Sequence, residues 1–154
     1  MNSFHRNKVD VVYYLLSKKD IIKDGIFNGL KRTTENVTYY IESAIPPSIK
    51  SIADAAFRYQ RNLEKITLPC SVTKIGEKTF KGCQSLIYVK IPSSVISIGS
   101  RAFSMCKLLK RIVIPSSVTV IRRKTFFGCR NLKQVIIPPS VTLIENCAFT
   151  ECTS

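Results

Sequence analysis

Residues 91–114 read IPSSVISIGSRAFSMCKLLKRIVI, and a shift of 23 residues in either direction reaches a recognisable copy of this stretch. Several positions keep one residue type along the chain. These positions are Pro46, Pro69, Pro92, Pro115 and Pro138; Phe57, Phe80, Phe103, Phe126 and Phe149; Ile52, Ile75, Ile98, Ile121 and Ile144; and Leu63, Leu86, Leu109 and Leu132. A period of roughly 20 to 29 residues with a Leu-x-x-Leu-x-Leu core is the signature of a leucine-rich repeat solenoid.

Each repeat predicts two short strands and a compact turn. Residues 87–91 form a strand that ends at Pro92, which cannot donate to a ladder, and 95–98 alternate apolar and polar residues as a second strand. In the turn 100–106, Ala102 and Phe103 are expected to point inward. The predicted fold is therefore a mainly β repeat solenoid, right-handed and gently curved. Its main strands, near 65–68, 88–91, 111–114 and 134–137, are expected to stack in parallel and in register as one sheet.

The first 44 residues differ from the rest in pattern. Two apolar stripes at helical spacing predict two short amphipathic helices, the first with Val9, Val12, Tyr13 and Leu16 and the second with Ile22, Ile26, Phe27 and Leu30. We therefore divide the chain into a helical N-terminal cap and connection, 1–44, and a solenoid of about five repeats, 45–154, with a first strand near 40–45. A cap covers the open apolar face of a terminal repeat; the alternative is a separate docking element.

The repeat resembles the BspA-like family of leucine-rich repeats, whose unit is similar to IPxSVTxIGxxAFxxCxxLxxIxIPxSV. The residues that carry the resemblance are Ile91, Pro92, Val95, Ile98, Gly99, Ala102, Phe103, Cys106, Leu109, Ile112 and Ile114. The chain departs from this unit where Gly76 and Gly99 give way to Arg122 and Glu145. The resemblance implies bacterial surface adhesins and related protist proteins, with roles in protein binding and attachment and with no catalytic residues.

The net charge and the cysteines limit which partners, cofactors and activities are expected. Of the net charge of +14, residues 45–154 carry +12, from 17 Lys/Arg and 5 Asp/Glu, which favours acidic partners. Four of six cysteines occupy one apolar column and are expected to be reduced and buried. With a single histidine, His5, and neither a Cys-x-x-Cys pair nor a phosphate-binding loop, we expect no metal, no cofactor and no enzyme activity.

The N-terminus does not predict a secretory signal. Its longest apolar run, 11–16, is six residues long, shorter than the roughly 7 to 15 residues of a signal sequence, and no stretch is long enough to span a bilayer. We therefore expect a cytoplasmic protein. The alternative, a protein at the cell surface, is what the family resemblance implies.

Strand alternation predicts a candidate protein-binding face. Two outward columns vary in residue type while the scaffold does not: Glu42, Lys65, Tyr88, Arg111 and Gln134, and Ala44, Thr67, Lys90, Val113 and Ile136. Tyr88 with Arg111 is the pair most like a binding hot spot. The alternative is that exposed positions vary without selection.

A second candidate surface is the basic column Lys78, Arg101 and Lys124, thickened by Arg122 and Arg123. It would suit an acidic protein, a phosphoinositide headgroup or a nucleic-acid backbone, although no RNA-binding aromatic motif or helix-turn-helix supports the last. The alternative is a solvated face. The leading hypothesis is thus a non-enzymatic protein-interaction module, in attachment or recognition, and the second is a basic, charge-driven binder of nucleic acid or an anionic membrane.

The last repeat predicts an unpaired strand edge beside Val135 and Ile137. Exposed edges are templates for pairing with another chain. Three alternatives follow. The final residues fold over the edge, the charges of Lys133, Glu145 and Glu151 keep it solvated, or two chains form a weak homodimer through it.

Overall fold

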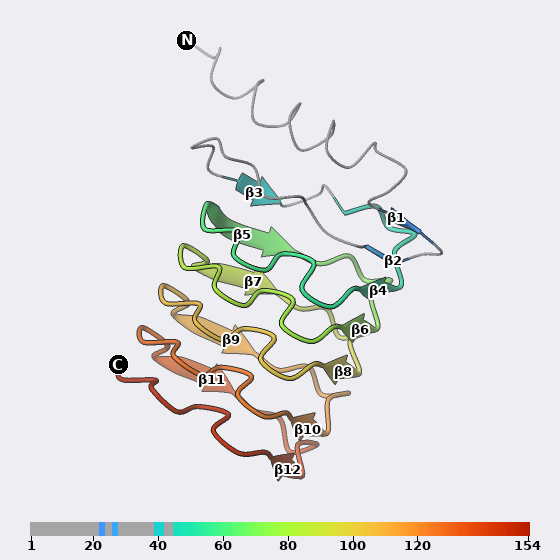
Figure 1. The fold of residues 1–154 in the computed structure, drawn as a ribbon. Coiled ribbons are helices and arrows are strands. Elements are labelled where there is room, and N and C mark those ends of the chain that lie inside the picture. The colour runs from blue at the N-terminus through green and yellow to red at the C-terminus, as the bar shows by residue number, and fades with distance from the viewer. Residues whose placement is uncertain (1–21, 24–25, 28–38, 42–44) are drawn as a thin grey trace.

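The repeats form stacked coils, each with a principal strand, a second short strand and a turn (Figure 1). The computed structural model describes residues 22–23, 26–27, 39–41 and 45–154. We number the coils 1 to 5: residues 39–60, 61–83, 84–106, 107–129 and 130–152. Their principal strands are β3 (Tyr39–Ile41), β5 (Leu63–Thr67), β7 (Tyr88–Lys90), β9 (Arg111–Val113) and β11 (Gln134–Ile136). The second strands are β4 (Ser51–Ile52), β6 (Lys74–Ile75), β8 (Ser97–Ile98), β10 (Val120–Ile121) and β12 (Leu143–Ile144).

Neighbouring strands pair in parallel within coils 1 to 3 and between coils 4 and 5, as the sequence predicts. The register follows the repeat, so that Lys65 pairs with Tyr88 and Arg111 pairs with Gln134. One irregularity occurs between β3 and β5, where the register shifts at Tyr39. The chain is therefore a parallel β-solenoid with strands on two sides, in which a residue keeps its column from coil to coil.

The second predicted helix is wrong. Ile22–Lys23 (β1) and Ile26–Phe27 (β2) are strands that pair antiparallel, and β2 continues the second ladder by pairing in parallel with β4. A sequence signal for this hairpin exists, because Asp24-Gly25 is the dipeptide that favours a two-residue hairpin turn. The first predicted helix lies outside the described residues, and the division of the chain at residue 44 stays a prediction.

The core is a set of identical residues stacked by translation. Phe57, Phe80, Phe103 and Phe126 are fully buried, and neighbouring rings lie nearly parallel with centroids 5.1, 5.2 and 5.6 Å apart, a favourable stacking range. Three of the four column cysteines, Cys83, Cys106 and Cys129, are buried beside them, whereas Cys152 in the last coil is only partly buried. The thiols of Cys83, Cys106 and Cys129 donate to backbone oxygens of the preceding coil at 3.0–3.2 Å. The inward orientation predicted for Phe103 is confirmed.

Each turn contains two residues in the left-handed region of φ. One position holds Ala55, Lys78, Arg101, Lys124 and Cys147, with φ from 56° to 58°, and the other holds Tyr59, Gly82, Met105, Gly128 and Glu151. At the second position, large and small residues alternate. A β-carbon on Gly82 would overlap the Tyr59 ring, and one on Gly128 would lie 2.5 Å from the sulfur of Met105. Each glycine therefore makes room for the side chain of the coil before it.

The predicted single principal sheet is wrong in one respect, because the ladders are interrupted between coils 3 and 4. The sheets divide into β3-β5-β7 and β9-β11 on one side, and β1-β2-β4-β6-β8 and β10-β12 on the other. Bonds such as Gly99 N to Ile75 O, at 2.9 Å, have no counterpart from Arg122 N to Ile98 O in this fully described segment. We call this interruption the seam. The turns still pair across it, for example through Phe103 N to Thr125 O at 2.9 Å.

We attribute the seam to the β-carbon of Arg122 together with the lack of a hydrogen-bond acceptor on its side chain. Gly99 lies so close to coil 2 that a β-carbon there would be 2.5 Å from the nitrogen of Glu77, and Arg122 brings a β-carbon to the same position of coil 4. Glu145, the equivalent in coil 5, keeps its backbone bond to Ile121 O, and its carboxylate also accepts a hydrogen bond from Arg123 N at 2.7 Å. Arginine has donors only, so Arg122 cannot accept such a bond from coil 3.

Candidate protein-binding face and groove

The outward columns of the principal strands lie where the sequence places them. Tyr88, Lys90, Arg111, Val113, Gln134 and Ile136 are exposed, whereas Lys65 and Thr67 are half-buried. Glu42 and Ala44 lie outside the described residues. The intervening side chains of Val89 and Ile112 are buried in the core. We call the eight described residues of the two columns the outer face.

The seam opens a groove in the middle of the outer face. It has a volume of about 320 Å³ and lies between β7 and β9, lined by Tyr88, Val89, Lys90, Ile91, Arg111, Ile112 and Val113. Four of these residues belong to the predicted binding columns. The sequence indicated their exposure, but it could not indicate the groove, which depends on two strands failing to pair. The groove therefore brings together residues that the repeat alone would only align.

The groove is positively charged. Lys90 and Arg111 are both exposed on it, and the ion pairs within residues 45–154 all lie on the turns: Glu77 with Lys78, Glu77 with Arg101, and Glu151 with Arg130. No acidic side chain of this described segment neutralises the groove cations. The arrangement can attract a negatively charged ligand, because unpaired cations near a low-dielectric surface act more strongly than in bulk water.

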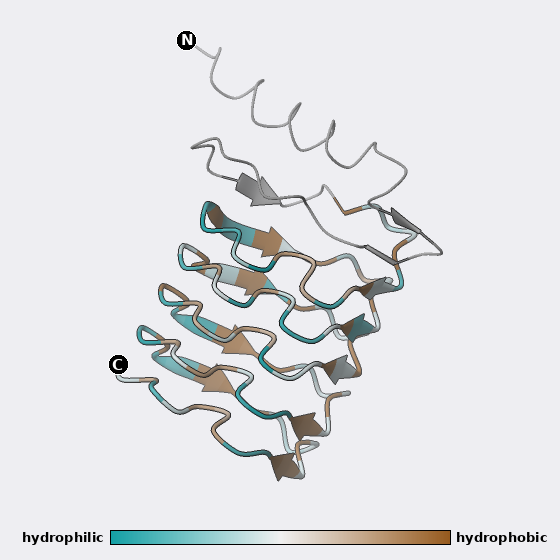
Figure 2. Cartoon of the chain, in the orientation of Figure 1, coloured by the Kyte–Doolittle hydropathy of each residue, from teal (hydrophilic) through white to brown (hydrophobic). Residues whose placement is uncertain are grey.

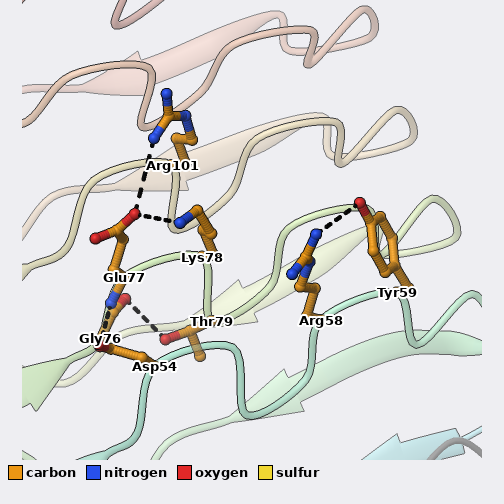
Figure 3. A network of polar contacts seen from close by, with 8 residues as sticks. All are labelled: Asp54, Arg58, Tyr59, Gly76, Glu77, Lys78, Thr79 and Arg101. Carbon is orange, nitrogen blue, oxygen red and sulfur yellow. Dashed lines mark hydrogen bonds and ion pairs between the residues drawn. The ribbon is translucent and has the colours of Figure 1, made fainter.

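The basic column of the turns is divided by one carboxylate (Figure 3). Glu77 lies 2.6 Å from Lys78 and 3.7 Å from Arg101, and hydrogen bonding to Lys78, with the charges of both cations, lowers the pKa of Glu77. Arg122 and Arg123 are exposed, and Lys124 lies 5.2 Å over the Phe127 ring. The column is thus partly neutralised by Glu77 at coils 2 and 3, whereas no ion pair within residues 45–154 involves its cations at coil 4.

The buried thiols of Cys83, Cys106 and Cys129 are expected to be poorly reactive. Burial raises the pKa of Cys83 and of Cys129 to about 12 and that of Cys106 well above its usual range. A thiol with so high a pKa is almost wholly protonated near neutral pH and is a poor nucleophile or metal ligand. Within the described residues, no group of three His, Cys, Asp or Glu side chains could hold a metal ion.

The stacked parallel strands, the buried Leu, Ile and Phe columns and the open outer face define a leucine-rich repeat solenoid, a class of proteins that generally serve as non-enzymatic scaffolds. A family profile described as "BspA type Leucine rich repeat region" matches residues 22–154 with six copies. The chain belongs to this BspA-type family. The match begins in the segment where β1 and β2 replace the predicted helix.

Solved bacterial proteins share the fold. A leucine-rich cell surface protein of Faecalibacterium prausnitzii is 35% identical, with a TM-score of 0.69 over 71% of this chain and 29% of its own. A leucine-rich repeat protein of T. pallidum is 28% identical, with a TM-score of 0.69 over 88% of this chain and 67% of its own. One from Bacteroides ovatus is 31% identical, with a TM-score of 0.59 over 70% of this chain and 34% of its own. The chain thus spans about a third of the first and third structures.

Two further findings concern the sequence and the helices of the chain. No curated protein sequence matches the chain. Among the residues that the structure describes, no helix is long and apolar enough to cross a membrane.

Proposed function

We propose that this chain is a protein-interaction module that binds its partner through the outer face. The observation that carries the proposal is the exposure of varied side chains, with Tyr88, Arg111 and Val113 around one groove, on strands whose intervening side chains Val89 and Ile112 are buried. Rigid repeats commonly recognise partners in this way. Tyrosine and arginine are also the residue types enriched at binding hot spots.

Photo-crosslinking tests the proposal. Benzoylphenylalanine replaces Tyr88 in one variant and Ile96 in a matched control, and Ile96 is 61% exposed beside the second ladder of the same coil. In extracts of the source cells, the variant at position 88 is expected to form discrete adducts with proteins, and the variant at 96 is not. Equal adducts at both positions, or none at 88, would overturn the proposal.

A charge-driven module is the second candidate function, and the cations Arg122 and Arg123 favour it because no ion pair within residues 45–154 involves them. Nucleic acid or an anionic membrane would then be the partner. Retention on heparin that is strong at about 50 mM salt and lost at about 200 mM supports this function. Retention that is unchanged in an Arg122→Glu/Arg123→Glu variant argues against a role for this site.

The cellular role follows from the partner. Attachment is the role suggested by the F. prausnitzii relative, which is a cell surface protein, whereas a cytoplasmic recognition module is the prediction from the sequence. The homodimer also stays a prediction. It would use the strand edge of the last coil beside Val135 and Ile137. Figure 2 shows β12 of the same coil in brown, and Leu143 and Ile144 are half-exposed there.

A further inference from the structure

We propose that the groove between β7 and β9 binds an extended, acidic segment of the partner protein. This inference rests on the proposed function, because it names the kind of partner that the outer face receives. It depends on the seam, on the arrangement of four side chains around it, and on the charge of the surroundings.

The four exposed side chains alternate in character. Tyr88 and Lys90 project from β7, and Arg111 and Val113 project from β9 at the equivalent positions of the next coil. Tyr88 therefore neighbours Arg111 across the groove, and Lys90 neighbours Val113. Apolar and cationic groups occupy opposite corners. Because residues two apart share one face of an extended segment, a segment with an acidic and an apolar side chain two residues apart could satisfy both kinds.

The backbone at the seam offers further hydrogen-bonding groups. In the adjoining interfaces, Leu68 N donates to Lys90 O at 3.1 Å and Ile114 N donates to Ile136 O at 2.9 Å. The equivalent bond from Ile91 N to Val113 O is missing within this described part of the chain, and both residues line the groove. Polar backbone groups without a protein partner are expected to bind water or a ligand.

Charge selects the acidic segment over a basic one. Lys90 and Arg111 have no ion-pair partner within residues 45–154, and the repeats in that range carry a net charge of +12. A basic segment would meet like charge both in the groove and at long range, whereas an acidic one would be attracted to both. Arg111 can also bind a carboxylate through two parallel hydrogen bonds.

The first experiment uses two synthetic peptides and the full chain labelled with 15N. The acidic probe is acetyl-Glu-Ser-Val-Ser-Glu-amide, which places both Glu and the Val on one face when extended, and its neutral control carries Gln in place of both Glu. The acidic probe is expected to shift the amide signals of 88–91 and 111–113 and to bind about tenfold more tightly than the control, because charge-assisted hydrogen bonds are stronger than neutral ones. Equal binding of both peptides, or no shift in the groove at millimolar peptide, would overturn the inference.

The second experiment uses two charge-matched variants. Lys90→Glu/Arg111→Glu is expected to abolish binding of the acidic probe, and Arg122→Glu/Arg123→Glu, with the same change of net charge on the turns, is expected to retain most of it. Signals of residues remote from the substitutions show that each variant is folded. If the turn variant loses as much binding as the groove variant, the attraction is general charge and the inference fails.

The two proposals can fail separately. If position 88 forms adducts with a partner but the acidic peptide leaves the groove signals unchanged, the outer face binds proteins of another chemistry and only this inference is wrong. If the peptide binds the groove but position 88 captures nothing, the groove chemistry holds and the proposed function is wrong.

Discussion

The interface between coils 2 and 3 and the interface between coils 3 and 4 join similar repeats, yet they are built differently. The first has both ladders, including Gly99 N to Ile75 O at 2.9 Å, and its phenylalanine centroids lie 5.2 Å apart. The second lacks both ladders, is paired at the turns, and has its centroids 5.6 Å apart. A column of identical core residues therefore keeps coils in register, while Gly99 leaves room for the close approach of coils 2 and 3.

The largest expected effect tests the shared part of the two interfaces. Phe103→Ala removes a fully buried ring that stacks on Phe80 on one side and on Phe126 across the seam. We expect it to lower the free energy of unfolding by about 3 to 5 kcal/mol, through lost burial and the cavity left behind. Urea denaturation measures the change. A loss below about 1 kcal/mol would mean that the ring column does not hold the coils together.

The second-largest effect is expected from a substitution that disrupts the close interface between coils 2 and 3. Gly99→Ala places a β-carbon 2.5 Å from Glu77 N and from the carbonyl carbon of Gly76, so coil 3 must move away from coil 2. We expect a loss of about 1 to 3 kcal/mol, the usual cost of overpacking. The control is Ser100→Ala at the neighbouring position, which is expected to change stability by less than about 0.5 kcal/mol. Equal effects of the two substitutions would show that the glycine is not required for close approach.

A third experiment compares the two sides of the seam through their thiols. Cys83 in coil 2 and Cys129 in coil 4 are both buried, with the pKa of each raised to about 12, so each is expected to react only when its coil opens. Because fewer backbone bonds cross the seam, we expect Cys129 to react with a thiol reagent about tenfold faster than Cys83 in native buffer, which corresponds to opening at about 1.4 kcal/mol lower cost. Mass spectrometry resolves the two sites, and equal rates would indicate one cooperative unit.

The smallest effect is expected from a substitution that closes the seam between coils 3 and 4. Arg122→Gly removes the β-carbon, and each restored backbone bond is expected to contribute about 0.5 to 1.5 kcal/mol. Glycine costs about 0.5 to 1 kcal/mol in chain entropy, so we expect a net gain of about 1 kcal/mol. We also expect slower hydrogen exchange at Thr119, whose amide lacks, among the described residues, the bond to Ile96 O that Ile96 N makes to Thr73 O at 2.9 Å. Arg122→Ala removes the same charge and keeps the β-carbon, and it should leave exchange at Thr119 unchanged. Similar exchange in the two variants would contradict our account of the seam.

The repeat made most of the fold predictable. Phe103 and its equivalents, 23 residues apart, indicated both the coil and its inward face. The second N-terminal helix was wrong because Ile22, Ile26 and Phe27 fit helical spacing and short strands alike, and only Asp24-Gly25 distinguished the two. The left-handed turn at Arg101 was also missed, since no glycine occurs in that column from coil 1 to coil 5.

The site was predictable in composition but not in shape. Alternation along a strand indicates that Tyr88 and Arg111 point outward, because it depends only on backbone geometry. The groove between them depends on β7 and β9 not pairing, which the repeat pattern does not indicate. The replacement of Gly99 by Arg122 at the next repeat was visible in the sequence, but its effect depends on the distance between two backbones.

The alternation of large and small residues in the turns has a consequence for how such a chain can grow in evolution. Tyr59 in coil 1 lies over Gly82 in coil 2, and Met105 in coil 3 lies over Gly128 in coil 4. Duplicating coil 1 alone would set a tyrosine against a second tyrosine, where only a glycine leaves room. Duplicating coils 1 and 2 together would preserve every such pair. To preserve the packing of this column, a duplication must therefore copy two repeats together, although the backbone conformation repeats with every single coil.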